Sequence, residues 1–264
     1  MEFRYTIGDD ARPQVKLLTI ATVLTIILWF VPFAEYLVYP FRLFVTFIHE
    51  GGHALVSLLT GGSVQSLTVA ADGSGVVFSA PSGRIGQLLT SSAGYLGTSA
   101  FGVLLLYLIR RRLSPNILLA GCGIIIGLLT VVFGIVSPAM NLLSLNVGLS
   151  SVMFTVLAGV SISSVLLIAA KFASQRTAAF AAAFLAVQCL MNALSDLKTL
   201  VFINAPLVGS DIQTDAANMS AASGIPGFVW AVLWLLISLV LVVVGLRMFA
   251  SLRSVSKNDS LFND

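Results

Sequence analysis

Two histidines and a glutamate lie within five consecutive residues, His49-Glu50-Gly51-Gly52-His53, and these are the only histidines of the 264-residue chain. In a helix, positions i and i+4 lie on one face, so both imidazoles can reach one metal ion. The glutamate next to the first histidine lies where a zinc-bound water would be. The spacing therefore predicts that His49 and His53 bind zinc and that Glu50 acts on the water.

A glutamate in this position predicts hydrolytic chemistry. Zinc lowers the pKa of a bound water toward about 7 and polarises a carbonyl group. Glu50 can then take a proton from that water and pass it to a leaving amine. The motif thus favours a zinc-dependent endopeptidase with Glu50 as the catalytic base. The alternative is that the buried His and Glu side chains bond structurally to neighbouring helices.

The third zinc ligand must come from elsewhere in the chain, because catalytic zinc usually has three protein ligands. Of the acidic residues, only Glu50 and Asp196 fall well inside predicted membrane spans. A carboxylate at membrane depth is costly unless it is paired or functional. A structural pair with Lys198 is poorly oriented, since residues two apart on a helix point in different directions. Asp196 is therefore the predicted third ligand, with Asp211 or Asp215 as alternatives.

The composition indicates a polytopic membrane protein. The chain is 58% hydrophobic and 9% charged, whereas about a quarter of the residues in a soluble domain are charged. We expect an all-α, single-domain membrane protein over residues 1–264. No basic run with interleaved aromatics suggests nucleic acid as a partner. Seven stretches are apolar enough to cross the bilayer, namely 15–38, 41–60, 87–109, 116–136, 151–170, 178–203 and 227–249.

Two connections are long enough to contain structure. Val64 to Ala70 and Gly75 to Ala80 are β-prone and flank an Asp72-Gly73 turn, which predicts a short hairpin rather than an unstructured loop. The polar connection 204–226 suits a loop that can include one short surface helix. Lys and Arg are more frequent on the side of the Arg110–Arg112 loop and the C-terminus. The positive-inside rule therefore predicts that this side is cytoplasmic and that the hairpin lies outside.

The chain resembles the M50 metallopeptidases, the site-2 protease group of intramembrane zinc proteases, and in particular the small M50B-like membrane proteins of bacteria. The resemblance rests on the His49–His53 motif in an early span, the hairpin after it and Asp196 in a late span. The stretch from Asp215-Ala216-Ala217 to Gly224-Ile225-Pro226, which leads into Trp230 and Trp234, adds to it.

The resemblance implies a function. It implies cleavage of a membrane-protein substrate within the bilayer, with zinc on His49, His53 and Asp196 and with Glu50 as the base. It implies that residues 64–80 present an edge strand to the substrate. It also implies a bacterial inner membrane location, with the hairpin more often on the cytoplasmic side, against the charge count.

The sequence departs from the family pattern at two places. The usual Asp-Gly pair is Asp196-Leu197 here, and the central Gly-Pro-x-x-Asn pattern is at best Gly94-Tyr95-Leu96-Gly97-Thr98. The main alternative function is a non-proteolytic, zinc-binding membrane scaffold derived from the same family. Retention of Glu50 favours the protease, because a structural zinc site needs no base and is normally closed by four ligands.

Overall fold

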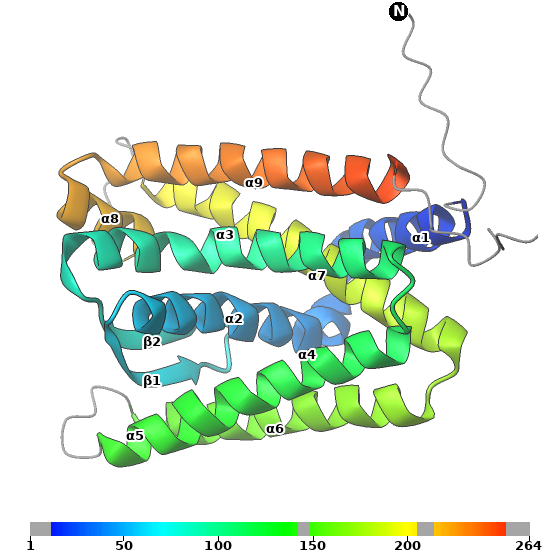
Figure 1. Cartoon of the computed structure of the whole chain (residues 1–264), viewed down its shortest axis with the longest axis horizontal. Coiled ribbons are helices and arrows are strands. Elements are labelled where there is room, and N and C mark those ends of the chain that lie inside the picture. Colours follow the sequence, from blue (N-terminus) through cyan, green and yellow to red (C-terminus); the bar gives the residue numbers. More distant parts are fainter. Residues whose placement is uncertain (1–11, 142–147, 205–213, 252–264) are drawn as a thin grey trace, which may run out of the picture.

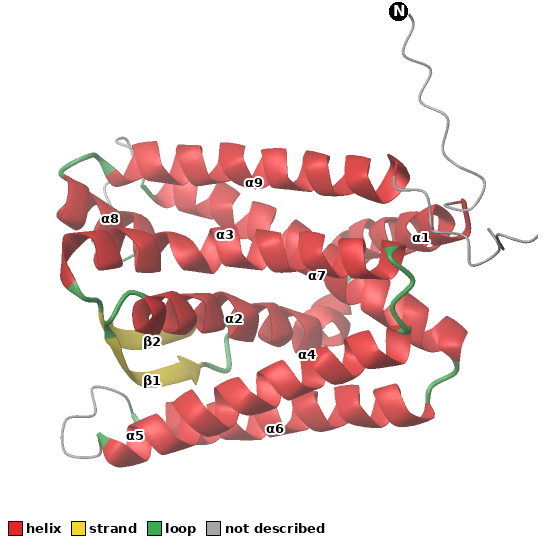
Figure 2. Cartoon of the chain, viewed as in Figure 1, coloured by secondary structure: helices red, strands yellow, loops and turns green. Residues whose placement is uncertain are grey.

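The computed structural model describes residues 12–141, 148–204 and 214–251, and helices make up most of this part of the chain (Figures 1 and 2). In chain order the elements are α1 (Arg12–Phe30), α2 (Ala34–Leu59), β1 (Ser63–Val69), β2 (Gly75–Ala80), α3 (Gly83–Arg110), α4 (Pro115–Leu129), a π-helical turn (Thr130–Val136), α5 (Ser137–Met140), α6 (Leu149–Phe172), α7 (Gln175–Ile203), α8 (Asp215–Ser223) and α9 (Gly227–Ser251).

Five helices of the described part are long and apolar enough to cross a membrane: 83–110, 115–140, 149–172, 175–203 and 227–249. They support an integral membrane protein, but the predicted count of seven spans is not confirmed. The apolar part of α1, Val15–Leu28, is shorter than a span. The 26-residue α2 has the length, but it contains Glu35, Arg42 and Glu50 and is not among the five.

Helix α2 lies inside the bundle and approaches α3 closely. A side chain at Gly52 would overlap the Ala93 carbonyl of α3, and one at Gly51 would meet the Leu129 side chain. Small residues at a helix interface allow such close backbone contact. Both glycines of the metal motif therefore serve helix packing. In the chain, α3 lies between the hairpin and the Arg110–Arg112 loop. If α3 crosses the membrane, the hairpin and this loop lie on opposite sides, which is what the orientation prediction requires.

The predicted hairpin is confirmed. Strands β1 and β2 pair antiparallel, with Val69 opposite Gly75 next to the turn. Gly73 has a φ of 84°, a left-handed conformation that glycine adopts without strain. The Asp72 carboxylate accepts hydrogen bonds from the Ser74 backbone N–H, at 2.9 Å, and from its hydroxyl, at 2.6 Å. The local sequence thus specifies the turn.

Contacts with two helices hold the hairpin in place, beneath α2 in Figure 1. From α2, the Tyr39 hydroxyl donates to the Ala71 carbonyl at 2.6 Å and the Thr46 hydroxyl donates to the Gly73 carbonyl at 2.8 Å. From α6, the fully buried Thr155 accepts from the Val69 backbone N–H at 2.7 Å. Thus α6 covers part of the outer edge of β1, while residues of β2 line a cavity.

Candidate metal centre

The two histidines of the motif lie one helical turn apart on α2, and their side chains converge. His49 Nε2 and His53 Nε2 are 3.1 Å apart. The ring centroids are 4.8 Å apart, and the rings are inclined at 72° to each other. This is the arrangement that the i, i+4 spacing predicts for two ligands of one ion.

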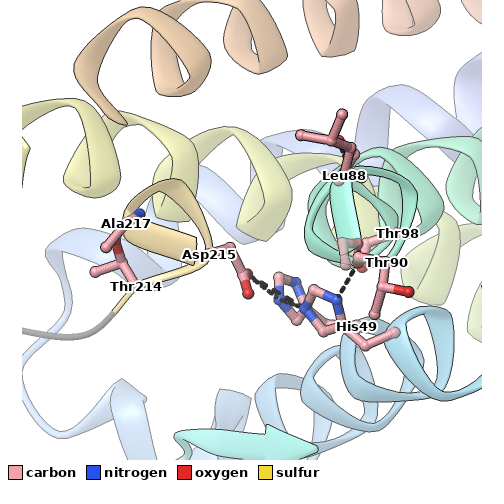
Figure 3. A network of polar contacts seen from close by, with 10 residues as sticks. His49, Leu88, Thr90, Thr98, Thr214, Asp215 and Ala217 are labelled. Carbon is pink, nitrogen blue, oxygen red and sulfur yellow. Dashed lines mark hydrogen bonds and ion pairs between the residues drawn. The ribbon is translucent and has the colours of Figure 1, made fainter. Parts of the chain in front are cut away.

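The residue that joins the histidines is Asp215, the first residue of α8. Its Oδ2 atom lies 3.4 Å from His49 Nε2 and 3.2 Å from His53 Nε2. Figure 3 shows this carboxylate directed from α8 at the two imidazoles of α2. One ligand atom from each of the three residues lies within 4.8 Å of the others, so the group can hold a metal ion.

The spacing of the three atoms fits zinc. With zinc–ligand bonds of about 2.0–2.1 Å, the ligand atoms of a tetrahedral site are about 3.3 Å apart. The observed separations of 3.1, 3.2 and 3.4 Å agree with that value. Two imidazoles and one carboxylate are also a donor set of catalytic zinc sites, in which the fourth position stays open for water or substrate.

A backbone carbonyl fixes the tautomer of His53. Its Nδ1 lies 2.6 Å from the Thr90 carbonyl oxygen of α3. A carbonyl oxygen can only accept, so Nδ1 carries a proton, and Nε2 is the nitrogen that faces the group and can coordinate an ion once it is deprotonated. His49 packs edge-on against the Tyr95 ring at a centroid distance of 4.6 Å, and Tyr95 stacks on Trp234 of α9 at 5.8 Å. Both imidazoles are thus oriented by α3.

Asp215 reaches the histidines because α8 is capped at one end and held at the other. The Thr214 hydroxyl accepts from the Ala217 backbone N–H at 3.1 Å, which caps the helix start. At the helix end, Arg84 of α3 donates to the Ala222 carbonyl at 2.6 Å and to the Ser223 carbonyl at 3.1 Å. These contacts fix α8 against α3, the helix that also orients His49 and His53.

The charge of Asp215 suits a metal ligand. Burial raises the pKa of its carboxyl, but the adjacent His53 and the hydrogen bonds from His49 and His53 outweigh burial. Together they hold the pKa of Asp215 well below its usual value. The carboxylate is therefore available as an anionic donor at neutral pH.

The three acidic residues that the sequence offers as a third zinc ligand differ in where the structure places them. Asp196, the predicted third ligand, lines the same cavity but is not one of the three residues whose ligand atoms converge. Asp211 lies outside the described residues. Asp215, the alternative candidate, is the acidic residue whose carboxylate lies beside the two imidazoles. The sequence signal that points to it is the Thr214-Asp215 pair, which is typical of a helix start in a polar connection.

The predicted base, Glu50, is buried at 5% exposure between α2 and the hairpin. A Cβ atom on Gly75 of β2 would come within 2.7 Å of its Oε1 atom, so the strand backbone approaches this carboxylate closely. His49, His53 and Asp215, together called the metal group below, line one cavity of about 910 Å³ with Glu50. Further residues around it come from β2, α3 and α7, namely Val76, Val77, Phe78, Tyr95, Asn192 and Asp196.

Gly94 of α3 leaves the space that the imidazoles occupy. A Cβ atom at this position would overlap the Nε2 atoms of both His49 and His53. We therefore expect Gly94→Ala to weaken zinc binding, because either the histidines or α3 must move. Gly97→Ala is the matched control, since its nearest neighbour beyond its own helix is the Gly52 Cα at an unstrained 3.9 Å. Competition with a chromogenic chelator measures both affinities, and equal values would contradict the packing role of Gly94.

The fold and the site together define a helical membrane protein in which two histidines and one carboxylate form a group that could hold a metal ion, beside a buried glutamate. A sequence model of the family described as Peptidase M50B-like matches residues 18–245. The chain belongs to this family, as the resemblance predicted. Comparisons with curated proteins and with solved structures give no match.

Proposed function

We propose that the protein is a zinc-dependent intramembrane endopeptidase that cleaves a membrane-protein substrate. Family membership supports a membrane metallopeptidase. The observation that carries the proposal is the convergence of His49 Nε2, His53 Nε2 and Asp215 Oδ2 in a cavity that Glu50 also lines. The proposal includes a bacterial cell membrane as the location, with the lipid bilayer as the surroundings, and the five apolar helices support the membrane part of it.

His49, His53 and Asp215 would hold the zinc ion. Bound zinc supplies Lewis acidity, which acidifies water and polarises a carbonyl group. Glu50 accepts the proton of the attacking water and passes it to the nitrogen of the leaving amine. Its burial keeps it out of bulk water, and its contact with Gly75 places it between the metal ligands and strand β2. A peptide bond beside β2 would therefore lie within reach of this base.

Strand β2 can hold the substrate in the form that hydrolysis requires. A peptide bond inside a helix has its carbonyl in the helical hydrogen-bond ladder, so a transmembrane segment must become extended before attack. An extended segment at membrane depth needs partners for its backbone N–H and C=O groups. Strand addition to the β2 edge supplies them, and β2 residues 75–79 line the cavity next to the metal group.

The alternative is a non-proteolytic zinc-binding scaffold of the same family. A structural zinc site is normally closed by four protein ligands. The cluster found in the described part of the chain has three, and a carboxylate that no ligand role requires lies beside them. These two features favour the peptidase.

The direct test is a cleavage assay with purified protein in detergent micelles. We expect the protein with one zinc per chain to cut transmembrane model peptides, to lose this activity on treatment with a chelator and to regain it with zinc. Mass spectrometry of the products identifies the cut bond. Zinc binding without cleavage of any peptide in a panel of helix-destabilised transmembrane segments would support the scaffold instead.

A further inference from the structure

One face of α7 carries a row of polar side chains that ends in the cavity. Gln188, Asn192 and Asp196 follow one another at four-residue spacing, which places them on one side of the helix. Gln188 Nε2 donates to the Thr25 hydroxyl of α1 at 3.0 Å. Asn192 Nδ2 donates to Gln188 Oε1 at 3.2 Å. Asn192 and Asp196 line the cavity that contains the metal group.

The hydrogen bonds in this row have a defined direction. The Thr25 hydroxyl gives its one proton to the Ala21 carbonyl, at 2.9 Å, so its oxygen accepts from Gln188. Gln188 must then present its amide nitrogen to Thr25 and its oxygen to Asn192. Asn192 accordingly directs its amide nitrogen at Gln188. Its carbonyl oxygen remains as an acceptor at the cavity end of the row.

Asp196 continues the row with a second acceptor. In the described part of the chain no hydrogen bond or ion pair is found for its carboxylate, which is exposed to the cavity. A carboxylate within a candidate span is costly unless a partner compensates it. Lys198 does not line the cavity. His49 and Arg42, which lies against the hairpin turn at Gly73, act on this carboxylate electrostatically, but in the described residues neither forms an ion pair or a hydrogen bond with it. The α7 wall therefore offers two acceptors and a negative charge.

We infer that Asn192 and Asp196 form a subsite that binds a basic side chain, lysine or arginine, of the substrate near the cleaved bond. This inference rests on the proposed peptidase function. A substrate segment along β2 shares the cavity with α7, so one of its side chains can reach this wall. A cationic donor satisfies both acceptors at once. A basic residue is also costly in lipid, so this subsite would draw such a residue into the cavity.

The test measures binding rather than cleavage. Zinc-loaded Glu50→Gln protein in detergent micelles is titrated with a fluorescent Leu/Ala transmembrane peptide that has one central Lys, Arg, Gln, Glu or Leu. We expect the Lys and Arg peptides to bind roughly tenfold or more tightly than the Leu peptide, since a charged hydrogen bond contributes about 1.5–3 kcal/mol. Asp196→Asn should remove most of this difference. Glu35→Gln, which removes an exposed carboxylate outside the cavity, should preserve it.

The outcomes separate the subsite from other roles of Asp196. Asp196→Lys should reverse the preference toward the Glu peptide, which a merely structural residue would not do. Equal affinities of the Lys and Leu peptides for the Asp196-containing protein would overturn the inference. So would loss of zinc from Asp196→Asn, because Asp196 would then be a metal ligand. Failure of the peptidase function is a separate result: the protein with Glu50 intact would leave the bound peptides uncut.

Discussion

Glu50→Gln protein should retain one zinc per chain and lose cleavage activity by roughly 10²–10⁴-fold, the usual contribution of a general base. Glutamine has nearly the same shape as glutamate, so the contact with Gly75 and the surrounding packing persist. Its amide cannot accept the proton of the attacking water. The loss should appear in kcat with the zinc content unchanged, as measured by a peptide-cleavage assay beside elemental analysis.

The Glu35→Gln variant is the control for Glu50→Gln, because Glu35 lies on the same helix but is exposed and outside the cavity. Its activity should equal that of the unmodified protein. Full activity in Glu50→Gln would show that Glu50 is not the base.

A second large effect is expected at Asp215, the proposed third ligand. Asp215→Ala should lower zinc affinity by more than about 100-fold, because changes to outer-shell partners alone cost about 10–100-fold and this change removes a ligand. Two histidines remain, and they make an incomplete site. The variant should lose both metal and cleavage activity. Competition with a fluorescent zinc chelator measures the affinity, and circular dichroism checks that the helices persist.

The matched control is Asp196→Asn, which changes another acidic residue in the cavity wall. It should retain zinc with an affinity close to that of the unmodified protein. The opposite result, with zinc kept in Asp215→Ala and lost in Asp196→Asn, would restore the assignment that the sequence favoured. It would also require the α8 carboxylate to move away from the histidines when metal binds.

The local parts of the site follow from the sequence. The i, i+4 spacing places His49 and His53 on one helix face whatever surrounds the helix, since helical geometry alone determines it. The hairpin follows from β-prone runs on either side of Asp72-Gly73, because the turn is built from the conformation of Gly73 and the side chain of Asp72. These features depend on residues a few positions apart, and the structure reproduces them.

The count of spans did not follow from the sequence in the same way. Apolar length predicts spans over 15–38 and 41–60, but α1 already ends at Phe30 and provides only Val15–Leu28 as a short apolar helix. Helix α2 carries the polar residues of the site and is sheltered by α3, the hairpin and the other helices around it. Hydropathy measures how apolar a segment is, and it does not show which neighbours a segment has.

The sequence by itself determined the metal motif, the membrane class and the hairpin, because each depends on composition or on near neighbours in the chain. The tertiary structure alone decided which carboxylate faces the histidines. Asp196 was favoured because it lies in a span, yet Asp215, 162 positions beyond His53 and outside the spans, meets the imidazoles. The contacts of Arg84 and of the Thr214 cap bring α8 to this position. Contacts between segments far apart in the chain determine where a residue of such a short connecting helix lies. Local sequence patterns do not show these contacts.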